Sequence, residues 1–214
     1  MITPDLKKGL SGARVVIVDD DPDVRKSLEG LLSSIGLPAR TYGSVPELLS
    51  SGPMSQTSCL ILDVRLPGRS GLEWYEEIRR AGEEWPVIFI SGHADVPMSV
   101  RAMKAGAFEF LTKPFRAQDL IDALQRAIER GSAQREQRIA LDTLRMRFGD
   151  LTSREREVMT LAVSGITNKK IAARLHLTEA TIKLHRGRVM LKMQATSIAS
   201  LVRMADKLGL PIPS

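Results

Sequence analysis

Five polar residues in the first part of the chain could together carry out chemistry on a phosphoryl group. Each follows or ends an apolar run, and they are Asp19, Asp20, Asp63, Ser91 and Lys113. Crowded carboxylates repel one another unless a cation compensates them. Oxygen ligands without a Cys or His cluster favour Mg²⁺ over zinc. An ammonium and a hydroxyl beside such a cation could stabilise the oxygens of a phosphoryl group in transfer.

Asp63 is the best candidate for the nucleophile, because a carboxylate can form an acyl phosphate. It stands alone at the end of the run CLILD, before the segment VRLPGRSG. Asp21 and Asp23 have a different explanation, since Pro22 directly follows Asp21. Both positions suit the start of a helix, one as its cap and the other in its first turn. We therefore expect these two acids to lie outside the magnesium site.

A particular fold must bring the five polar residues together. The first part of the chain alternates strand-like apolar runs with segments of helical spacing, in five βα units. Such a pattern predicts an α/β domain over 13–130, with a five-stranded parallel (βα)5 sheet covered on both faces. Because ligands bind at the carboxyl ends of parallel strands, the five residues are expected to converge at that edge.

A helical linker is predicted to follow, over 131–148. The apolar stripe of the last βα helix weakens at Gly131 and Ser132 and resumes in QREQRIALDTLRMRFG. No sustained heptad repeat supports a coiled coil. The sequence leaves open whether this helix is continuous.

The last part, 149–212, is predicted to be a small all-α domain that binds nucleic acid. Residues 151–214 hold 11 Lys and Arg against 4 Asp and Glu, in a chain of net charge +6. A concentrated basic module favours a polyanionic partner. Two short helices joined by the turn HLT, the second one basic, have the form of a helix-turn-helix. Helix caps are expected at Thr152, with Glu155 in a capping box, and at Thr167 and Thr178.

The segment EATIKLHRGRVMLKM is the expected recognition helix. One stripe should face the core of the module, and it consists of Ile182, His185, Val189 and Met193. The residues expected at or beside DNA are Lys169, Lys170, Thr181, Lys183, Leu184, Arg186, Gly187 and Arg188. Phosphate contacts would give affinity, and contacts in the major groove would give sequence choice.

The chain resembles two-component response regulators of the NarL/FixJ type, which have a receiver domain and a LuxR-type helix-turn-helix domain. The resemblance lies in the stretches VDDDPDVRKSL, LILDVRLPGRSGLE, PVIFISGHADVPMSVRAMKAGAFEFLTKPF and LTSREREVMTLAVSGITNKKIAARLHLTEATIKLHRGRVMLKM. It is closest to the FixJ subgroup. The combination of strand-end residues is specific, whereas each motif alone would be weak.

The resemblance implies roles at the acidic site. Asp63 would accept phosphate from a sensor histidine kinase. Asp20 and Asp63 would bind Mg²⁺ directly, together with the backbone carbonyl of Arg65, and Asp19 would act through metal-bound water. No enzymatic activity is expected beyond self-phosphorylation and autodephosphorylation.

Further roles follow from the same resemblance. Ser91 and Lys113 match the family's hydroxyl and lysine positions, and the Lys113–Pro114 peptide is expected to be cis. Phe110 stands at the position of the switch aromatic, where many members have Tyr. A phenylalanine has no hydroxyl, so the switch would act here by packing alone.

The family's partners are expected as well. Phosphorylation would favour a homodimer through the surface of about 96–111, which would bind double-stranded DNA at two half-sites and act with RNA polymerase. The chain has no run of about 18 or more uncharged apolar residues, so no membrane span is indicated and a cytoplasmic location is expected.

Two alternatives stay open. One is a phosphorylation-independent DNA-binding regulator with an inactive receiver. The other is a Mg²⁺-dependent phosphatase, which needs an acidic residue two positions after its nucleophile, where this chain has Arg65. Arg65 and His93 are instead predicted to set the lifetime of the aspartyl phosphate, because such positions line the route of attacking water in the family.

Overall fold

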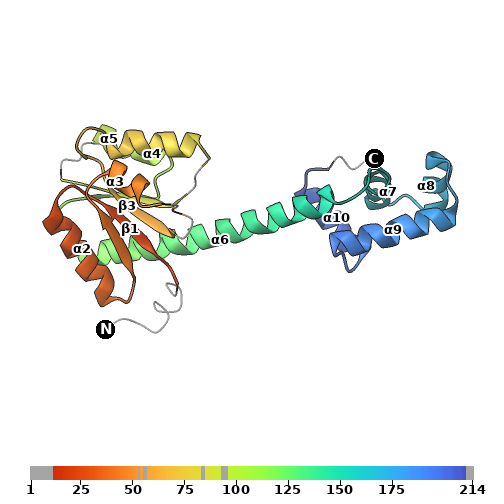
Figure 1. Cartoon of the computed structure of the whole chain (residues 1–214), viewed down its shortest axis with the longest axis horizontal. Helices are drawn as coiled ribbons and strands as arrows, with labels where there is room; N and C mark the ends of the chain where they lie inside the picture. Colours follow the sequence, from red (N-terminus) through yellow and green to blue (C-terminus); the bar gives the residue numbers. More distant parts are fainter. Residues whose placement is uncertain (1–11, 53, 55–56, 83–84, 93–95, 211–214) are drawn as a thin grey trace. The chain divides into compact units, whose positions relative to one another are not determined.

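The computed structural model describes residues 12–52, 54, 57–82, 85–92 and 96–210 (Figure 1). The chain forms two compact units, Met1–Gln134 and Arg135–Ser214.

The first unit contains a five-stranded parallel sheet, as the sequence predicted. The strands are β1 Val15–Val18, β2 Ala39–Tyr42, β3 Cys59–Asp63, β4 Val87–Ser91 and β5 Glu109–Thr112. They lie in the order β2-β1-β3-β4-β5. β1, β3 and β4 are buried at every position, which explains their continuous apolar runs. The direction of winding reverses between β1 and β3, so the topological switch point lies at their carboxyl ends.

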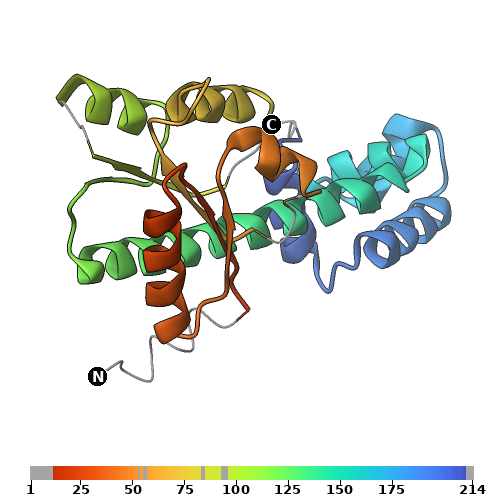
Figure 2. The ribbon, with the colours of Figure 1, turned by 60° about the vertical axis from the view of Figure 1, so that its left-hand side comes forward.

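Five helices cover the two faces of this sheet. They are α2 Pro22–Ser34, α3 Val45–Ser50, α4 Gly71–Arg80, α5 Val96–Lys104 and α6 Ala117–Gly149. α2 and the first part of α6 pack on one face, and α3, α4 and α5 pack on the other (Figure 2). Successive side chains of a strand point to opposite faces of the sheet: Ile17 of β1 packs in the core on one face and Val18 in the core on the other.

Asp21 and Asp23, in the acidic run after β1, begin a helix, as predicted. Oδ1 of Asp21 accepts hydrogen bonds from the backbone N–H groups of Asp23, at 2.8 Å, and Val24, at 3.3 Å. Asp21 is thus the cap of α2, with Pro22 at the start of the helix. Asp23 lies in the first turn, where the helix dipole favours a negative charge.

α6 is a single helix of 33 residues, without a break at Gly131. A Cβ atom on Gly131 would lie 2.7 Å from Cγ of Pro86 and 3.2 Å from its Cδ. The glycine therefore allows α6 to approach the residue that precedes β4. Close packing, and not interruption of the helix, explains why this position lacks a side chain.

Gly131→Ala is expected to destabilise the first unit, although alanine is the better helix former. Alanine favours a helix interior by roughly 0.5–1 kcal/mol over glycine, while forcing a methyl group into a packed contact costs about 1–3 kcal/mol. Gly30→Ala is the matched control, because nothing lies within 4 Å of the added methyl group in α2. Urea unfolding should show a lower free energy of unfolding for Gly131→Ala and a higher one for Gly30→Ala. A stabilised Gly131→Ala would contradict the packing explanation.

The second unit, from Arg135 on, is helical. It contains the end of α6 and the helices α7 Ser153–Val163, α8 Asn168–Leu175, α9 Glu179–Met193 and α10 Ile198–Lys207. The predicted capping box of Thr152 and Glu155 is confirmed, and the side chain of Thr178 caps α9. Thr167 is the N-cap of α8 but makes no side-chain capping bond.

The inward stripe of α9 is confirmed with one exception. Ile182, Val189 and Met193 are almost fully buried. His185 is only half-buried, and its Nδ1 atom is buried without a hydrogen-bond partner among the residues that the structure describes. The stripe packs α9 against α7, α8 and α10, which fixes the outward face of the predicted recognition helix.

Candidate phosphoryl-transfer site and nucleic-acid interface

The strand-end residues meet at one edge of the sheet. Nζ of Lys113 lies 2.5 Å from Oδ2 of Asp19 and 2.8 Å from Oδ2 of Asp63. Lys113 follows β5, Asp19 follows β1 and Asp63 ends β3. The predicted convergence is therefore confirmed for these three residues, and it depends on the parallel order of the strands.

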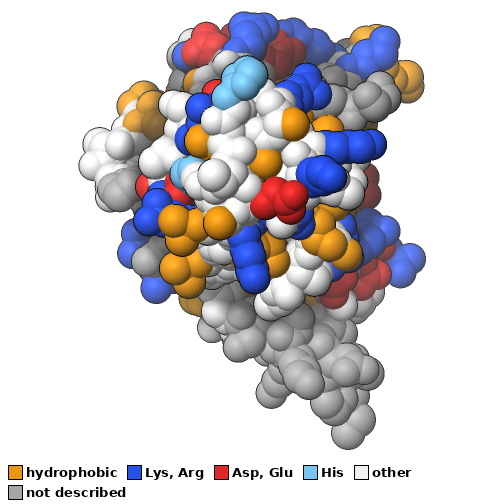
Figure 3. Space-filling model, turned by 90° about the vertical axis from the view of Figure 1, so that its right-hand side faces the viewer, with side chains coloured by type: hydrophobic (Ala, Val, Ile, Leu, Met, Phe, Trp, Pro, Cys, Tyr) orange, Lys and Arg blue, Asp and Glu red, His pale blue; other side chains and the backbone are white. Residues whose placement is uncertain are grey.

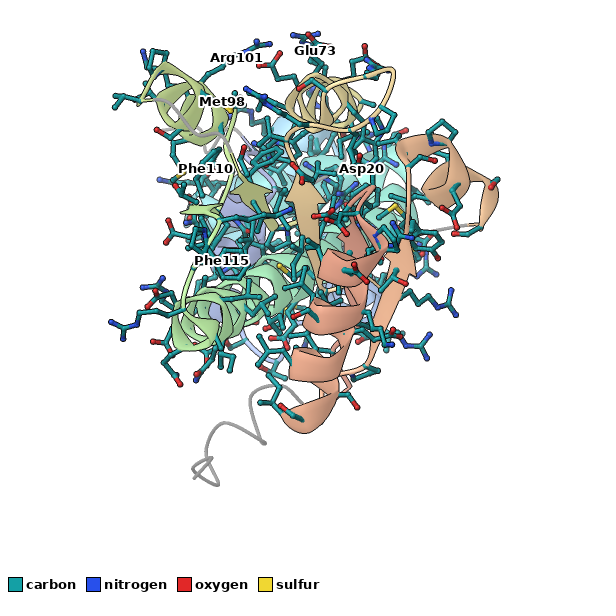
Figure 4. The ribbon with its side chains drawn as sticks, turned by 90° about the vertical axis from the view of Figure 1, so that its left-hand side faces the viewer. Asp20, Glu73, Met98, Arg101, Phe110 and Phe115 are labelled. Atoms are coloured by element: carbon teal, nitrogen blue, oxygen red, sulfur yellow. The ribbon has the colours of Figure 1, made fainter. Side chains whose placement is uncertain are left out.

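Asp20 joins them to complete a group of three carboxylates. One oxygen of each of Asp19, Asp20 and Asp63 lies within 4.8 Å of the others. Asp19 is fully buried and Asp63 is 7% exposed, while Asp20 is exposed. Figure 4 looks onto this edge and labels Asp20 beside the ends of the strands. The cluster is thus buried on one side and open to solvent on the other.

Hydrogen bonds orient the two buried carboxylates. Oδ1 of Asp19 accepts from the backbone N–H of Asp21 at 3.0 Å, and Oδ1 of Asp63 accepts from the backbone N–H of Arg65 at 2.8 Å. The Oδ2 atoms of both face Lys113. Each side chain is therefore held at both oxygens.

The charges of the cluster favour a divalent cation. Burial raises the pKa of Asp19, against the opposing hydrogen bonds from Lys113 and Asp21. Burial by itself would lower the pKa of Lys113, but its hydrogen bonds to Asp19 and Asp63 outweigh this and raise it. Lys113 therefore stays protonated and contacts Asp19 and Asp63, so a single ammonium lies in a cluster of three carboxylates. Clustered carboxylate oxygens with an excess of negative charge suit Mg²⁺.

Ser91 and Lys113 are held together by the backbone. Ser91 is fully buried at the end of β4, and its carbonyl oxygen accepts from the N–H of Lys113 at 2.8 Å. The Lys113–Pro114 peptide is cis, as predicted. The two remaining predicted residues differ: Arg65 is exposed, and His93 lies outside the described residues.

Phe110 belongs to a row of aromatic rings that the sequence did not reveal. Its ring centroid lies 6.5 Å from that of Phe89, which lies 5.5 Å from Tyr75 in an edge-on contact. The hydroxyl of Tyr75 donates to the carbonyl oxygen of Gly106 at 2.8 Å. Figure 4 labels Phe110 in β5. The row thus connects β5, β4 and α4 with the turn before β5.

The second unit presents the predicted outer face of α9. Four predicted residues are exposed there: Lys183, Leu184, Gly187 and Arg188. A shallow depression runs along them and is bounded by Ala180 and Leu191. Figure 3 shows the molecule from the right-hand side of Figure 1, where the second unit lies, with Lys and Arg side chains spread among apolar ones. Such a mixture suits phosphate contacts together with contacts to base edges.

Comparisons with known proteins match both parts of the chain. Residues 15–125 match the response regulator receiver domain, and residues 150–205 match the bacterial regulatory proteins of the luxR family. The chain is 48% identical to nodulation protein W of Bradyrhizobium diazoefficiens, over 92% of this chain and 87% of that protein. The chain belongs to the response regulators of the NarL/FixJ type.

Other members of the family extend the match. The transcriptional regulatory protein FixJ of Azorhizobium caulinodans is 41% identical, over 89% of this chain and 90% of its own length. The solved structure of the response regulator StyR is 41% identical and covers 92% of this chain and all of that one, with a TM-score of 0.86. Within the described residues of this response regulator, no helix has the length and apolar character needed to span a bilayer.

Two residues of the LuxR-type domain that were predicted to meet DNA have partners inside the protein. Nη1 of Arg186 donates to Oδ1 of Asn168 at 2.6 Å and so ties α9 to the start of α8. The hydroxyls of Thr181 and Thr178 lie 2.8 Å apart, within the cap of α9. Lys169 and Lys170, by contrast, are exposed at the start of α8.

An ion pair inside the LuxR-type domain was not predicted from the sequence. Glu155 is 2% exposed, and its Oε2 lies 2.7 Å from Nζ of Lys192, which also donates to the carbonyl oxygen of Asp150 at 3.1 Å. The capping-box spacing predicts a structural role for Glu155, but nothing in the sequence distinguishes Lys192 from the other basic residues of the domain. The pair joins the start of α7 to the end of α9.

Lys192→Met is expected to lower the free energy of unfolding of this domain by about 1–2 kcal/mol, because it leaves a buried carboxylate without its charged partner. The hydrogen bond from Lys192, with that from Thr152, holds the pKa of Glu155 below its ordinary value. The ionised Glu155 therefore stabilises the folded domain fully above the ordinary pKa of a glutamate. This contribution is lost as the pH falls through the pKa of Glu155 in the folded state. Urea unfolding should show the loss at pH 7 and a smaller loss in acid. Exposed Lys183→Met is the control, and an equal loss at both pH values would contradict the assignment.

Proposed function

We propose that phosphorylation of Asp63 by a sensor histidine kinase switches this response regulator, which then binds double-stranded DNA as a homodimer to regulate transcription. The observation that carries the proposal is the meeting of Asp63 with Lys113 and two further carboxylates at the switch point of the sheet. The same chain carries a LuxR-type domain. The functional divisions that we propose are receiver 13–130, linker 131–148 and DNA-binding domain 149–212.

The acidic residues would hold Mg²⁺, with Asp20, Asp63 and the backbone carbonyl of Arg65 as direct ligands and Asp19 acting through water. When bound, the ion would offset the negative charge of the phosphoryl oxygens and the carboxylates. The hydrogen bonds to Oδ1 of Asp19 and of Asp63 support this assignment, because they fix both carboxylates toward the cluster.

A carboxylate oxygen of Asp63 would attack the phosphorus atom and form the O–P bond of an acyl phosphate. The bond from phosphorus to the donor, N–P in a phosphohistidine or O–P in acetyl phosphate, would break and leave its electron pair on the donor. The ammonium of Lys113 already lies 2.8 Å from this carboxylate, so it would face a phosphoryl oxygen without a large movement. The hydroxyl of Ser91 would donate to a second oxygen. Because Ser91 ends β4 and Phe110 packs on Phe89 of the same strand, a shift of Ser91 would let Phe110 repack.

A dimer face over about 96–111 would respond to that repacking. α5 carries a row of exposed apolar side chains, Val96 at 75%, Val100 at 43% and Met103 at 46% exposure. Only Ala102 of this helix is fully buried, so α5 is lightly anchored. Apolar exposure on a lightly anchored helix favours a partner there, and a second copy would present two recognition helices to two half-sites. RNA polymerase is the further partner that transcription control implies.

The DNA contacts that we propose come from α8 and α9. Lys183, Leu184 and Arg188 would enter or border the major groove, with Thr181 at the start of α9, while Lys169 and Lys170 would meet phosphates. Gly187 offers no side chain, and nothing lies within 4 Å of a Cβ built on it. It would let the backbone approach the base edges closely. Arg186 would act mainly by holding α9 on α8 through Asn168.

The lifetime of the acyl phosphate would depend on Arg65. Its side chain is exposed two positions after Asp63, where it can screen the phosphoryl group from water. Arg65→Ala is therefore expected to change the rate of dephosphorylation, measured on the isolated phosphoprotein, with His93→Ala as a second variant. Unchanged rates in both variants would disprove the assignment.

One experiment tests the switch. The full chain is incubated with acetyl phosphate and Mg²⁺ and is then analysed by intact mass and gel filtration, beside Asp63→Asn. The wild type is expected to gain the mass of one phosphate and to dimerise, and the variant to do neither. A wild type that gains no phosphate but binds DNA would favour the alternative of a phosphorylation-independent regulator. Mass gain without dimerisation would remove the dimer from the proposal and leave the phosphoacceptor.

A further inference from the structure

We propose that Arg25 is a positioning residue of the magnesium site, which holds the chain after β1 so that Asp19 and Asp20 face the same cation. The inference rests on the proposed function, since it concerns that site. Nη1 of Arg25, in α2, donates to the backbone carbonyl oxygen of Asp19 at 2.6 Å and to that of Asp20 at 3.0 Å. Arg25 thus contacts the main chain of two proposed metal-site residues and not their carboxylates.

Two successive carbonyl oxygens, those of Asp19 and Asp20, converge on one nitrogen of Arg25, so the backbone does not continue there as a regular strand. Along a strand, successive side chains point to opposite faces. A continued strand would therefore send the carboxylates of Asp19 and Asp20 apart. Instead, one oxygen of each lies within 4.8 Å of an oxygen of Asp63. β1 ends at Val18, and the chain turns directly after it, around the guanidinium of Arg25.

Asp19 and Asp20 differ in how firmly they are held without Arg25. The N–H of Asp19 donates to the carbonyl of Tyr42 at 3.1 Å, and its two carboxylate oxygens accept from Asp21 and Lys113. The carbonyl of Asp19 is the remaining polar group, and Arg25 binds it. Asp20 is exposed, so the bond from Arg25 to its carbonyl has the larger part in placing it.

The guanidinium of Arg25 lies close to the segment around Gly43. A Cβ atom on Gly43 would lie 3.4 Å from Nη1 of Arg25 and 3.4 Å from Oε2 of Glu47. The N–H of Gly43 donates to that same Oε2 at 2.6 Å. The guanidinium therefore lies beside the chain that connects β2 to α3. A planar, permanently charged group with several donors suits a fixed bridge of this kind.

The expected effect is on metal affinity. Groups that orient metal ligands without touching the metal typically contribute about 10- to 100-fold to affinity. Arg25→Met keeps an apolar stem and removes every donor, so we expect Mg²⁺ to bind about 10-fold more weakly or worse. Arg25→Lys keeps the charge on a less constrained stem and should give an intermediate affinity. Lys26→Met is the matched control, because Lys26 is the next residue of α2, is exposed and loses the same charge.

The test uses the full chain in these four forms. Electron paramagnetic resonance of free Mn²⁺ gives the affinity for that ion, and competition gives the affinity for Mg²⁺. Hydrogen–deuterium exchange of the amides of residues 19–24, measured with EDTA, reports the backbone directly. We expect weaker binding and faster exchange in Arg25→Met, and wild-type values within about twofold in Lys26→Met, as for surface changes generally.

Each outcome bears on the inference. Wild-type affinity and wild-type exchange in Arg25→Met would overturn it. If Arg25→Met does not fold, as judged by circular dichroism, Arg25→Lys decides: weaker Mg²⁺ binding supports the inference and unchanged binding overturns it. If the wild type binds neither ion, the proposed function fails, and the exchange rates alone then decide whether Arg25 positions this turn.

Discussion

Lys113→Met is expected to lower the free energy of unfolding of the receiver domain by about 2 kcal/mol or more in EDTA, and to abolish phosphorylation-dependent dimerisation. The ammonium is the counter-charge of two buried carboxylates, at 2.5 Å from Asp19 and 2.8 Å from Asp63, and its own side chain is 20% exposed. Methionine preserves the length of the stem and removes the charge. The cost arises because removal of one partner leaves like charges facing each other at short range.

A double-mutant cycle separates this electrostatic cost from a packing defect. Asp19→Asn in the Lys113→Met background removes one of the uncompensated charges and should restore much of the stability, as urea unfolding at pH 7 would show. Phosphorylation should not return, because the proposed contact to the phosphoryl group is still missing. Mg²⁺ should stabilise Lys113→Met more than the wild type, since the ion replaces the absent charge.

The control for the cycle is Lys104→Met, which removes an exposed lysine at the end of α5 and should leave stability nearly unchanged. Lys113→Met as stable as the wild type in EDTA would contradict the role of the ammonium as counter-charge. Loss of stability that Asp19→Asn does not relieve would assign the effect to packing.

Much of this arrangement was predictable from sequence, for identifiable physical reasons. Buried parallel strands need continuous apolar runs, so β1, β3 and β4 stood out. Parallel strands end at one edge, so Asp63 and Lys113 could be placed together although 50 residues separate them. Asp21 could be separated from the acidic site because Pro22 follows it, and the capping bonds confirm that separation.

The sequence could not predict contacts between residues of different helices and strands. Arg25 reads as one polar residue on an amphipathic helix, and its bonds to the turn after β1 depend on where α2 sits. Arg186 reads as a DNA-contacting cation, yet Asn168 is 18 residues away and accepts from it. Gly131 weakens the helical pattern in the sequence and leaves the continuity of the helix open, whereas in the structure it is a contact point for Pro86 within α6. In each case the position of the residue in the tertiary structure determines its role, and the local sequence alone is compatible with more than one role.

Gly71→Ala is expected to slow phosphorylation of Asp63 by about 100-fold, the order of loss that a misplacement of about 1 Å produces at a reacting group. Gly71 is the first residue of α4 and contacts no reacting atom. A Cβ on it would clash with the backbone carbonyl oxygen of Asp63, and would also come within 3.0 Å of Cγ of Leu62. Both obstacles belong to the end of β3, so the strand that carries the proposed nucleophile must shift.

The start of α4 cannot move away instead, because it is bonded to the same strand end. The N–H of Gly71 donates to the carbonyl oxygen of Val64 at 2.9 Å, and the hydroxyl of Ser70 donates to that oxygen at 3.2 Å. Displacing the helix would break both bonds, so the added methyl group displaces Asp63. Gly92→Ala is the matched control beside the site, since nothing lies within 4 Å of its added methyl group. With circular dichroism confirming the fold, the rate of mass gain from acetyl phosphate measures the effect. A folded Gly71→Ala that is phosphorylated at the wild-type rate would show that the position of Asp63 does not depend on this contact.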